Sequence, residues 1–376
     1  MKSLSTGMGL KDRLKQFDIC LLICTSILSI MSLLLMYSIA DASERHAGLL
    51  KMQAAATFAG VCVMVFLATV DYQEVVNKLW LPFLIAEIGL LGITLLYGVA
   101  EGENKSWLEI GPITIQPSEF VKGTFIVTFS KHLDLVKHRI NHPLSLLGLG
   151  LHAGTIVGLI LLSGDLGVAL VYCGIVALML FCAGLSLFYF LGAGVVVFVA
   201  IPYVWEFLAD YQRYRIIYGF DPESDPEHYG YQALLGRQAL ANGGFFGNGI
   251  HGGEYYKDLF ACENDFAFSS LCEKFGLIGG MLVLICLAIV VIRVFAIART
   301  SRKDSGAFIC IGVAAAIVVQ TAENVGMCLA MLPVIGITLP FISYGGSSTL
   351  AMYLLLGMVH SVKTHRVKYN FEREHA

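Results

Sequence analysis

Charged residues within or beside apolar stretches are the candidates for chemistry in this chain. Asp265 closes the longest polar interval, residues 210–265, and an apolar stretch follows it directly, so a carboxylate lies at the mouth of a predicted membrane helix. Glu119 and Lys122 share one face of a predicted helix and can neutralise each other. An ionisable pair inside a membrane is a functional candidate by default. A purely structural ion pair that orients the helix explains it equally well.

Three further polar positions interrupt apolar stretches. Asp165 begins one of them, and the role of a helix N-cap is sufficient to explain it. Glu323 lies inside another, where a polar side chain usually faces the interior of the bundle. Residues 332–348 contain two prolines and end in Gly-Gly-Ser-Ser. Because irregular backbone at membrane depth must be covered by protein or line a water-filled cavity, this segment is expected to line a site, with backbone N–H groups suited to an anion.

The composition determines which elements can position these residues. Hydrophobic residues make up 57% of the 376 residues and charged residues only 14%, which indicates an integral membrane protein. Stretches long enough to cross roughly 30 Å of hydrocarbon predict about ten transmembrane helices. They are 18–40, 51–70, 79–99, 117–133, 143–162, 165–183, 185–207, 265–292, 306–333 and 345–362. The expected fold is therefore an all-α membrane protein, a single polytopic domain over residues 1–376, whose first apolar run is retained as a helix.

The distribution of lysine and arginine predicts the orientation. Clusters near residues 2–15, 131–139, 299–303 and 363–373 all fall on one side of the predicted helices, and the other side is poorer in both residue types. The positive-inside rule then places both termini in the cytoplasm and the loop of residues 208–264 outside the cell membrane. Aromatic residues interleaved through that loop argue against a disordered linker.

The sequence gives less support to a transporter, a metalloprotein or a nucleic-acid-binding protein. The chain shows no persuasive symmetry between halves, which weakens the interpretation as an inverted-repeat transporter. Its ten cysteines lie mostly within apolar stretches without metal-ligand spacing, so they are expected to act as packing residues. No metal ligands are assigned, and no nucleic-acid partner is expected.

The motifs of the chain resemble those of the SEDS family (shape, elongation, division and sporulation), which includes RodA and FtsW. The matching residues are Lys105-Ser106-Trp107, Gln116-Pro117-Ser118-Glu119 with Lys122, Asp165-Leu166-Gly167, Tyr211-Gln212-Arg213 with Arg215, Tyr231-Gln232, Asp265-Phe266 with Phe268, Glu273, and the run from Asn324 to Met327 and on through Leu339 to Ser348. They occur in family order over nearly the whole chain. The Asn-Val-Gly-Met run and the lack of long tails favour the RodA side of the family.

The resemblance implies a peptidoglycan glycosyltransferase of the bacterial plasma membrane that polymerises lipid II, a disaccharide-pentapeptide on undecaprenyl diphosphate. Asp265 corresponds to the family's essential aspartate, and we assign it the role of general base toward the acceptor hydroxyl. Its surroundings depart from the family's usual Pro-Glu-x-His-Thr-Asp-Phe pattern. Phe260-Ala261 stand in place of Pro-Glu, and Glu263-Asn264 stand in place of His-Thr. These changes are compatible with an altered substrate, an altered partner or reduced activity.

The remaining site predictions concern the lipid-linked diphosphate. Guanidinium groups bind phosphate in a bidentate manner, so Arg213 and Arg215 are the main candidates, and Lys105 and Arg237 are weaker ones. The full set of predicted substrate-binding residues is Lys105, Glu119, Lys122, Arg213, Arg215, Gln232 and Ser343. A divalent cation such as Mg²⁺ or Mn²⁺ remains an open possibility as cofactor.

The resemblance also implies a partner, a class B penicillin-binding protein, in addition to membrane lipid. Two alternative functions stay open on the sequence alone. A lipid II flippase would use the same groove and charges but would need no general base, and a non-catalytic scaffold for the penicillin-binding protein would keep the fold and lose the site. The role in elongation, division or sporulation is not distinguished by these residues.

Overall fold

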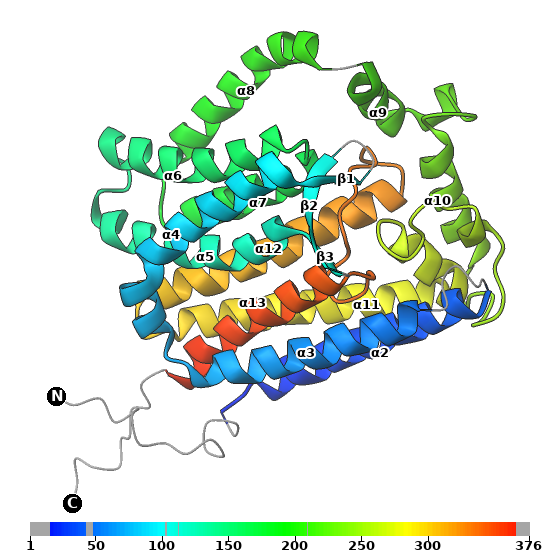
Figure 1. The fold of residues 1–376 in the computed structure, drawn as a ribbon, viewed down its shortest axis with the longest axis horizontal. Coiled ribbons are helices and arrows are strands. Elements are labelled where there is room, and N and C mark those ends of the chain that lie inside the picture. The colour runs from blue at the N-terminus through cyan, green and yellow to red at the C-terminus, as the bar shows by residue number, and fades with distance from the viewer. Residues whose placement is uncertain (1–15, 43–47, 102–103, 112, 209, 366–376) are drawn as a thin grey trace, which may run out of the picture.

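Twelve α-helices make up most of the computed structural model, which describes residues 16–42, 48–101, 104–111, 113–208 and 210–365. The helices are α2 (Ile19–Ala42), α3 (Leu49–Thr69), α4 (Tyr72–Tyr97), α5 (Pro117–Val136), α6 (Pro143–Leu162), α7 (Leu166–Cys182), α8 (Leu187–Phe207), α9 (Asp210–Phe220), α10 (Tyr231–Asn242), α11 (Ala267–Arg299), α12 (Asp304–Cys328) and α13 (Gly346–Thr364). Most of the long helices run side by side in one bundle (Figure 1). The prediction of an all-α membrane fold is confirmed.

A helix coincides with each of the ten predicted spans. Within the described part of the chain, six helices are long and apolar enough to cross a membrane, namely α2, α3, α4, α6, α11 and α12, and two shorter apolar helices cover 166–182 and 187–203. Helix α5 is not in that group, and it carries four charged residues, Glu119, Lys122, Lys131 and Asp134. The exact number of membrane crossings therefore stays a prediction.

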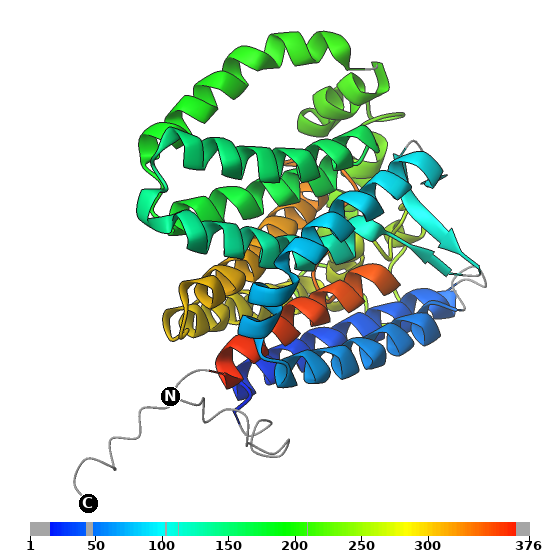
Figure 2. The same ribbon diagram turned by 60° about the vertical axis from the view of Figure 1, so that its left-hand side comes forward.

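Helix α12 forms the centre of the bundle. It packs against α11, α7 and α5, and it is the most enclosed of the long apolar helices. On the other side of the bundle, α13 lies along α3 over most of its length (Figure 2). Gly60 of α3 faces the Tyr353 ring and Gly357 of α13 faces the backbone of Met64, so glycines allow the two helices to approach closely.

Two sequence signals correctly predicted where helices begin. Pro117 occupies the first turn of α5, with Gln116 at the N-cap position. The carboxylate of Asp165 accepts a hydrogen bond from the Val168 amide at 3.1 Å and so caps α7. The predicted capping role of Asp165 is therefore confirmed.

The connections between helices contain more structure than the sequence predicted. A small antiparallel sheet of β1 (Val99–Glu101), β2 (Asn104–Ile110) and β3 (Ile113–Ile115) precedes α5. The predicted loop 208–264 contains α9, α10 and two 3-10 turns, η4 (Pro222–Ser224) and η5 (Tyr255–Lys257). In Figure 1 these elements lie together at one end of the bundle.

Two buried residues of α11 hold part of this region in place. Glu273 accepts hydrogen bonds from the backbone amides of residues 254, 255 and 256 at 2.8–3.0 Å and from the Asn242 side chain at 2.9 Å. The Lys274 ammonium donates to the carbonyls of residues 250 and 252 and lies 3.8 Å from the centre of the Tyr256 ring. The region is therefore tied to the bundle by charge-assisted hydrogen bonds.

Helix α11 is broken one turn beyond these anchors. Gly276 has φ +69°, a left-handed conformation that favours glycine. The amide of Leu277, freed by the break, donates to the carbonyl of Gly244 at 2.8 Å. The predicted span 265–292 is thus a short segment followed by a long one, and the break is where Gly244 and Phe245 contact the helix.

Candidate active site around Asp265

Asp265 lies two residues before the start of α11, and its backbone is held by the end of α12. The Asn324 side-chain amide donates to the Asp265 carbonyl at 2.8 Å and to the Ile337 carbonyl at 2.7 Å. Asn324 is fully buried, and its bond to the Ile337 carbonyl is shielded from water. The thiol of Cys328, one turn further along α12, lies 3.7 Å from the same Asp265 carbonyl. One side chain thereby couples the residue before α11 to the irregular segment after α12.

That irregular segment, residues 329–345, lies directly against the residues around Asp265. The Ser343 hydroxyl donates to the Asn264 carbonyl at 2.6 Å and accepts from the Leu339 amide at 2.8 Å. The Tyr344 amide donates to the Glu263 carbonyl at 2.8 Å. The segment expected from the sequence to line a site therefore lines the backbone of residues 263–265.

A glycine keeps the space next to the Asp265 carboxylate open. Gly336 has φ +73°, and a Cβ at this position would lie 3.4 Å from the Asp265 Oδ2 atom. Glycine tolerates this backbone conformation at no steric cost, whereas other residues are strained by it. Asp265 itself is partly exposed. The Asp265 backbone is thus held by Asn324, and Gly336 places no side chain against the Asp265 carboxylate.

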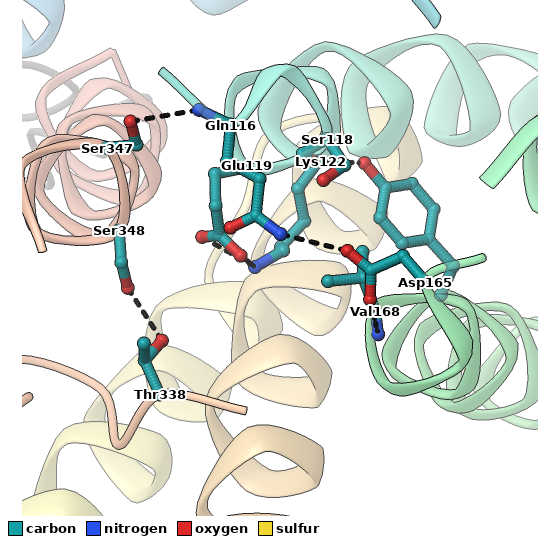
Figure 3. A network of polar contacts seen from close by, with 10 residues as sticks. Gln116, Ser118, Glu119, Lys122, Asp165, Val168, Thr338, Ser347 and Ser348 are labelled. Atoms are coloured by element: carbon teal, nitrogen blue, oxygen red, sulfur yellow. Dashed lines mark hydrogen bonds and ion pairs between the residues drawn. The ribbon is translucent and has the colours of Figure 1, made fainter. Parts of the chain in front are cut away.

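A second polar group lies between α5, α7 and the start of α13 (Figure 3). The Lys122 ammonium binds both oxygens of Glu119, at 2.9 and 3.0 Å, and the two side chains are 0% and 4% exposed. The Gln116 amide donates to the Asp165 carboxylate at 2.9 Å, and its backbone N–H donates to the Ser347 hydroxyl at 3.2 Å. The predicted Glu119–Lys122 pair is therefore present and buried.

A hydrogen bond connects this group to the segment beside Asp265. The hydroxyls of Thr338 and Ser348 lie 2.8 Å apart, at the place where the irregular segment passes into α13 (Figure 3). Residue 338 follows Ile337, whose carbonyl is held by Asn324. The two polar groups thus border the same stretch of backbone, 336–348.

The other predicted substrate-binding residues belong to β2, α9 and α10, which lie at the same end of the bundle (Figure 1). Gln232 of α10 accepts from the Phe260 amide at 2.8 Å, which ties α10 to the segment that leads into Asp265. The Arg213 guanidinium donates to the carbonyls of Trp205 and Glu206 at 3.0 and 2.9 Å and so closes the end of α8. Arg215 and Lys105 are exposed. Contact of these residues with substrate stays a prediction.

Sequence reasoning did not give Asn324 and Gly336 roles at the site. In the sequence Asn324 stands only within a motif, and its signal, a polar side chain inside a membrane-length helix, is shared with the neighbouring Gln320 and Glu323. Among the described residues, no group of three or more histidines, cysteines and carboxylates is placed to hold a metal ion. Burial and the nearby Glu263 carboxylate raise the pKa of Tyr344, so this phenol stays neutral.

Comparison with known proteins identifies the family. Residues 14–368 match the model of the cell cycle protein family FtsW/RodA/SpoVE. The chain is 31% identical to the Escherichia coli K12 peptidoglycan glycosyltransferase MrdB over 353 residues, covering 91% of this chain and 93% of MrdB. It is 32% identical to the stage V sporulation protein E of Bacillus subtilis over 319 residues, covering 81% and 84%.

Solved structures agree with this. A chain from work on the structural coordination of polymerization and crosslinking by a peptidoglycan synthase complex superposes with a TM-score of 0.80 at 27% identity, covering 92% of this chain and 97% of that chain. The Thermus thermophilus rod shape determining protein RodA shares the fold, with a TM-score of 0.71 at 24% identity over 94% and 98% of the two chains. This chain therefore belongs to the FtsW/RodA/SpoVE family of cell cycle proteins.

Proposed function

We propose that this chain is a peptidoglycan glycosyltransferase that polymerises lipid II, with Asp265 as the general base. The observation that carries the assignment is the Asp265 carboxylate itself, which is partly exposed, bordered by Gly336, and fixed through its backbone by Asn324. Relatives over nearly the full chain are named peptidoglycan glycosyltransferases, which supports the reaction class.

The proposed reaction is one displacement at the anomeric carbon of the donor sugar. Asp265 takes the proton of the acceptor hydroxyl as the oxygen bonds to that carbon, and undecaprenyl diphosphate leaves with the electrons of the broken bond. Because the diphosphate is already a good leaving group, the two carboxylates of a glycoside hydrolase are not needed. One carboxylate with correct geometry is sufficient for the proton transfer.

Charged groups near the site are proposed to hold the diphosphate. Arg215 is exposed and available for this role, with Lys105 as a second cation. Arg213 already donates to two backbone carbonyls, so its proposed contact with phosphate requires it to share or exchange those bonds. Glu119, Lys122, Gln232 and Ser343 are proposed to shape the site, because each is hydrogen-bonded to residues that border it or lies in the adjoining polar group. A divalent cation remains an open addition.

The proposed location is the bacterial plasma membrane, with both termini in the cytoplasm and the Asp265 end of the bundle outside. Multiple apolar helices support a multi-pass membrane protein. We further propose a complex with a class B penicillin-binding protein, which crosslinks the strand that this chain would make. The likeness to a chain of a solved peptidoglycan synthase complex supports such a partner.

A polymerisation assay tests the function against the flippase and scaffold alternatives. The purified chain, with its cognate penicillin-binding protein, is incubated with lipid II in detergent, and the products are resolved by size. A polymerase gives a ladder of glycan strands. A flippase makes no bond, and detergent offers no two sides to move between, so a wild-type protein that binds lipid II without forming a ladder would contradict the proposal.

A further inference from the structure

A row of four hydrogen-bonded side chains crosses α4, α5 and α6, away from Asp265. The Thr128 hydroxyl of α5 lies 3.3 Å from both oxygens of Glu87 on α4 and 3.3 Å from Nε2 of His152 on α6. The same hydroxyl lies 3.1 Å from the Phe125 carbonyl of its own helix, so donation to Glu87 exchanges with that local bond. Nδ1 of His152 lies 3.2 Å from Nδ1 of His132, one turn further along α5. The order of the row is therefore Glu87, Thr128, His152 and His132.

The row extends from a buried carboxyl toward the far end of the bundle. Glu87 is 1% exposed, whereas His152 and His132 are partly exposed. His132 lies in the last two turns of α5, and the ion pair of Lys137 with Asp304 marks where α5 ends beside the start of α12. Because Asp265 lies at the opposite end of α12, the row reaches solvent or headgroups on the other side of the bundle from the proposed active site.

Among the residues that the structure describes, no basic side chain pairs with Glu87. The hydroxyls of Thr124 and Thr128 face it from α5, His152 approaches it through Thr128 from α6, and the Tyr172 phenol lies within electrostatic range on α7. The other elements that pack on α4 are α12, α13 and β2, and none of their described charged side chains, Lys105 and Glu109 of β2 included, forms an ion pair with Glu87. An unpaired carboxylate inside hydrocarbon is costly, so the neutral, protonated acid is favoured.

Both inner members of the row can accept one proton and donate another: His152 does so through its two ring nitrogens, and Thr128 through its single hydroxyl oxygen. With Glu87 ionised, His132 Nδ1–H donates to His152, His152 Nε2–H donates to Thr128, and the Thr128 hydroxyl donates to Glu87. With Glu87 protonated, every one of these bonds reverses direction. Both states satisfy all members of the row, which is the requirement for passing one proton along it.

We propose that these four residues form a proton relay that loads and unloads Glu87 from the end of the bundle opposite Asp265. A proton from water binds Nε2 of His132, Nδ1–H of His132 passes to Nδ1 of His152, Nε2–H of His152 passes to Thr128, and the Thr128 hydroxyl proton passes to Glu87. One proton enters and one carboxyl is neutralised, so charge and atoms balance. The relay gives the bundle a response to pH on that side that does not involve the general base.

Infrared spectroscopy of the full chain in lipid nanodiscs tests this proposal without any assay of glycosyl transfer. Glu87→Gln identifies the C=O stretching band of the protonated Glu87 carboxyl at neutral pH. Transfer into D₂O then gives the rate at which this band exchanges. Thr128→Val and His152→Phe keep nearly the same shapes and remove the relay atoms. Thr155→Val of α6, whose hydroxyl bonds only its own helix at Leu151, is the matched control.

The relay predicts that the band is present in wild type and that its exchange slows by roughly 10²-fold in Thr128→Val and His152→Phe, the lower end of what a positioned acid or base contributes to proton transfer. Thr155→Val should exchange as wild type does. Exchange at the wild-type rate in both relay variants would overturn the proposal, because protons would then reach Glu87 by another path. A band that is not lost in Glu87→Gln would overturn it as well, since Glu87 would not hold the proton.

Discussion

Replacing Lys122 by methionine tests whether the buried ion pair beside the site is structural. The substitution removes the ammonium group that binds both oxygens of Glu119 at 2.9 and 3.0 Å, in a place where the two side chains are 0% and 4% exposed. Removing one member of a buried pair leaves an uncompensated charge and costs about 3–5 kcal/mol. That cost lowers the folding equilibrium constant by roughly 10²- to 10⁴-fold.

The assay is denaturant-induced unfolding of the purified chain in detergent, with matched variants. The free energy of unfolding of Lys122→Met should be about 3–5 kcal/mol lower than that of wild type. Glu119→Gln combined with Lys122→Met should regain part of this loss, because the unpaired Glu119 charge is then absent. Lys78→Met is the control, since Lys78 and Glu74 form an ion pair on α4 whose side chains are 71% and 66% exposed. Exposed helical pairs contribute only about 0.3–0.5 kcal/mol.

Normal stability of Lys122→Met together with loss of polymer formation would refute this reasoning. The pair would then contribute to the substrate site and not to the stability of α5.

Three further predictions concern positioning, pH and topology. Asn324→Asp removes the donors that hold the Asp265 backbone and should lower kcat about 10²-fold with little change in KM, measured by steady-state polymerisation, because such a loss is typical of a misplacement near 1 Å. Burial raises the pKa of Asp18, but hydrogen bonds from Arg293 and Lys363 outweigh it and hold that pKa well below its usual range. Protonation of Asp18 at low pH removes this stabilisation, so the melting temperature should fall as pH drops below about 4. The fall should be smaller in Asp18→Asn, measured in melting curves against pH. A cysteine placed at exposed Ser224 should react with a membrane-impermeant thiol reagent in cells stripped of outer barriers, and one at exposed Arg302 should not.

The positions of the helices could be predicted because each depends on local sequence. Apolar runs of membrane length marked ten of the twelve helices, and Pro117 and Asp165 marked two of their first turns. The small sheet of residues 99–115 was missed, since its strands are short and carry no strong apolar alternation. Helices α9 and α10 were missed as well, because their polar sequences resemble a loop.

The site could be predicted only as a set of residues, because its geometry depends on contacts between distant parts of the chain. Asn324 reaches Asp265 across 59 residues, and Ser343 reaches Asn264 across 79. No sequence pattern fixes such pairings. For the same reason Cys262, which lies in the predicted outer loop, is 3% exposed in the folded chain and is a poor topology probe without introduced cysteines.

The measurement that tests the central claim most directly is lipid II polymerisation by Asp265→Asn. Asparagine has nearly the shape of aspartate but cannot take a proton, and a general base contributes about 10²–10⁴-fold to a rate. Asp258→Asn is the matched control, an exposed residue in the same segment whose backbone carbonyl, not its side chain, faces Gln232. With the penicillin-binding protein present, wild type and Asp258→Asn should give glycan ladders, while Asp265→Asn should bind lipid II and leave it unchanged. A ladder of equal intensity from Asp265→Asn would contradict its assignment as the base.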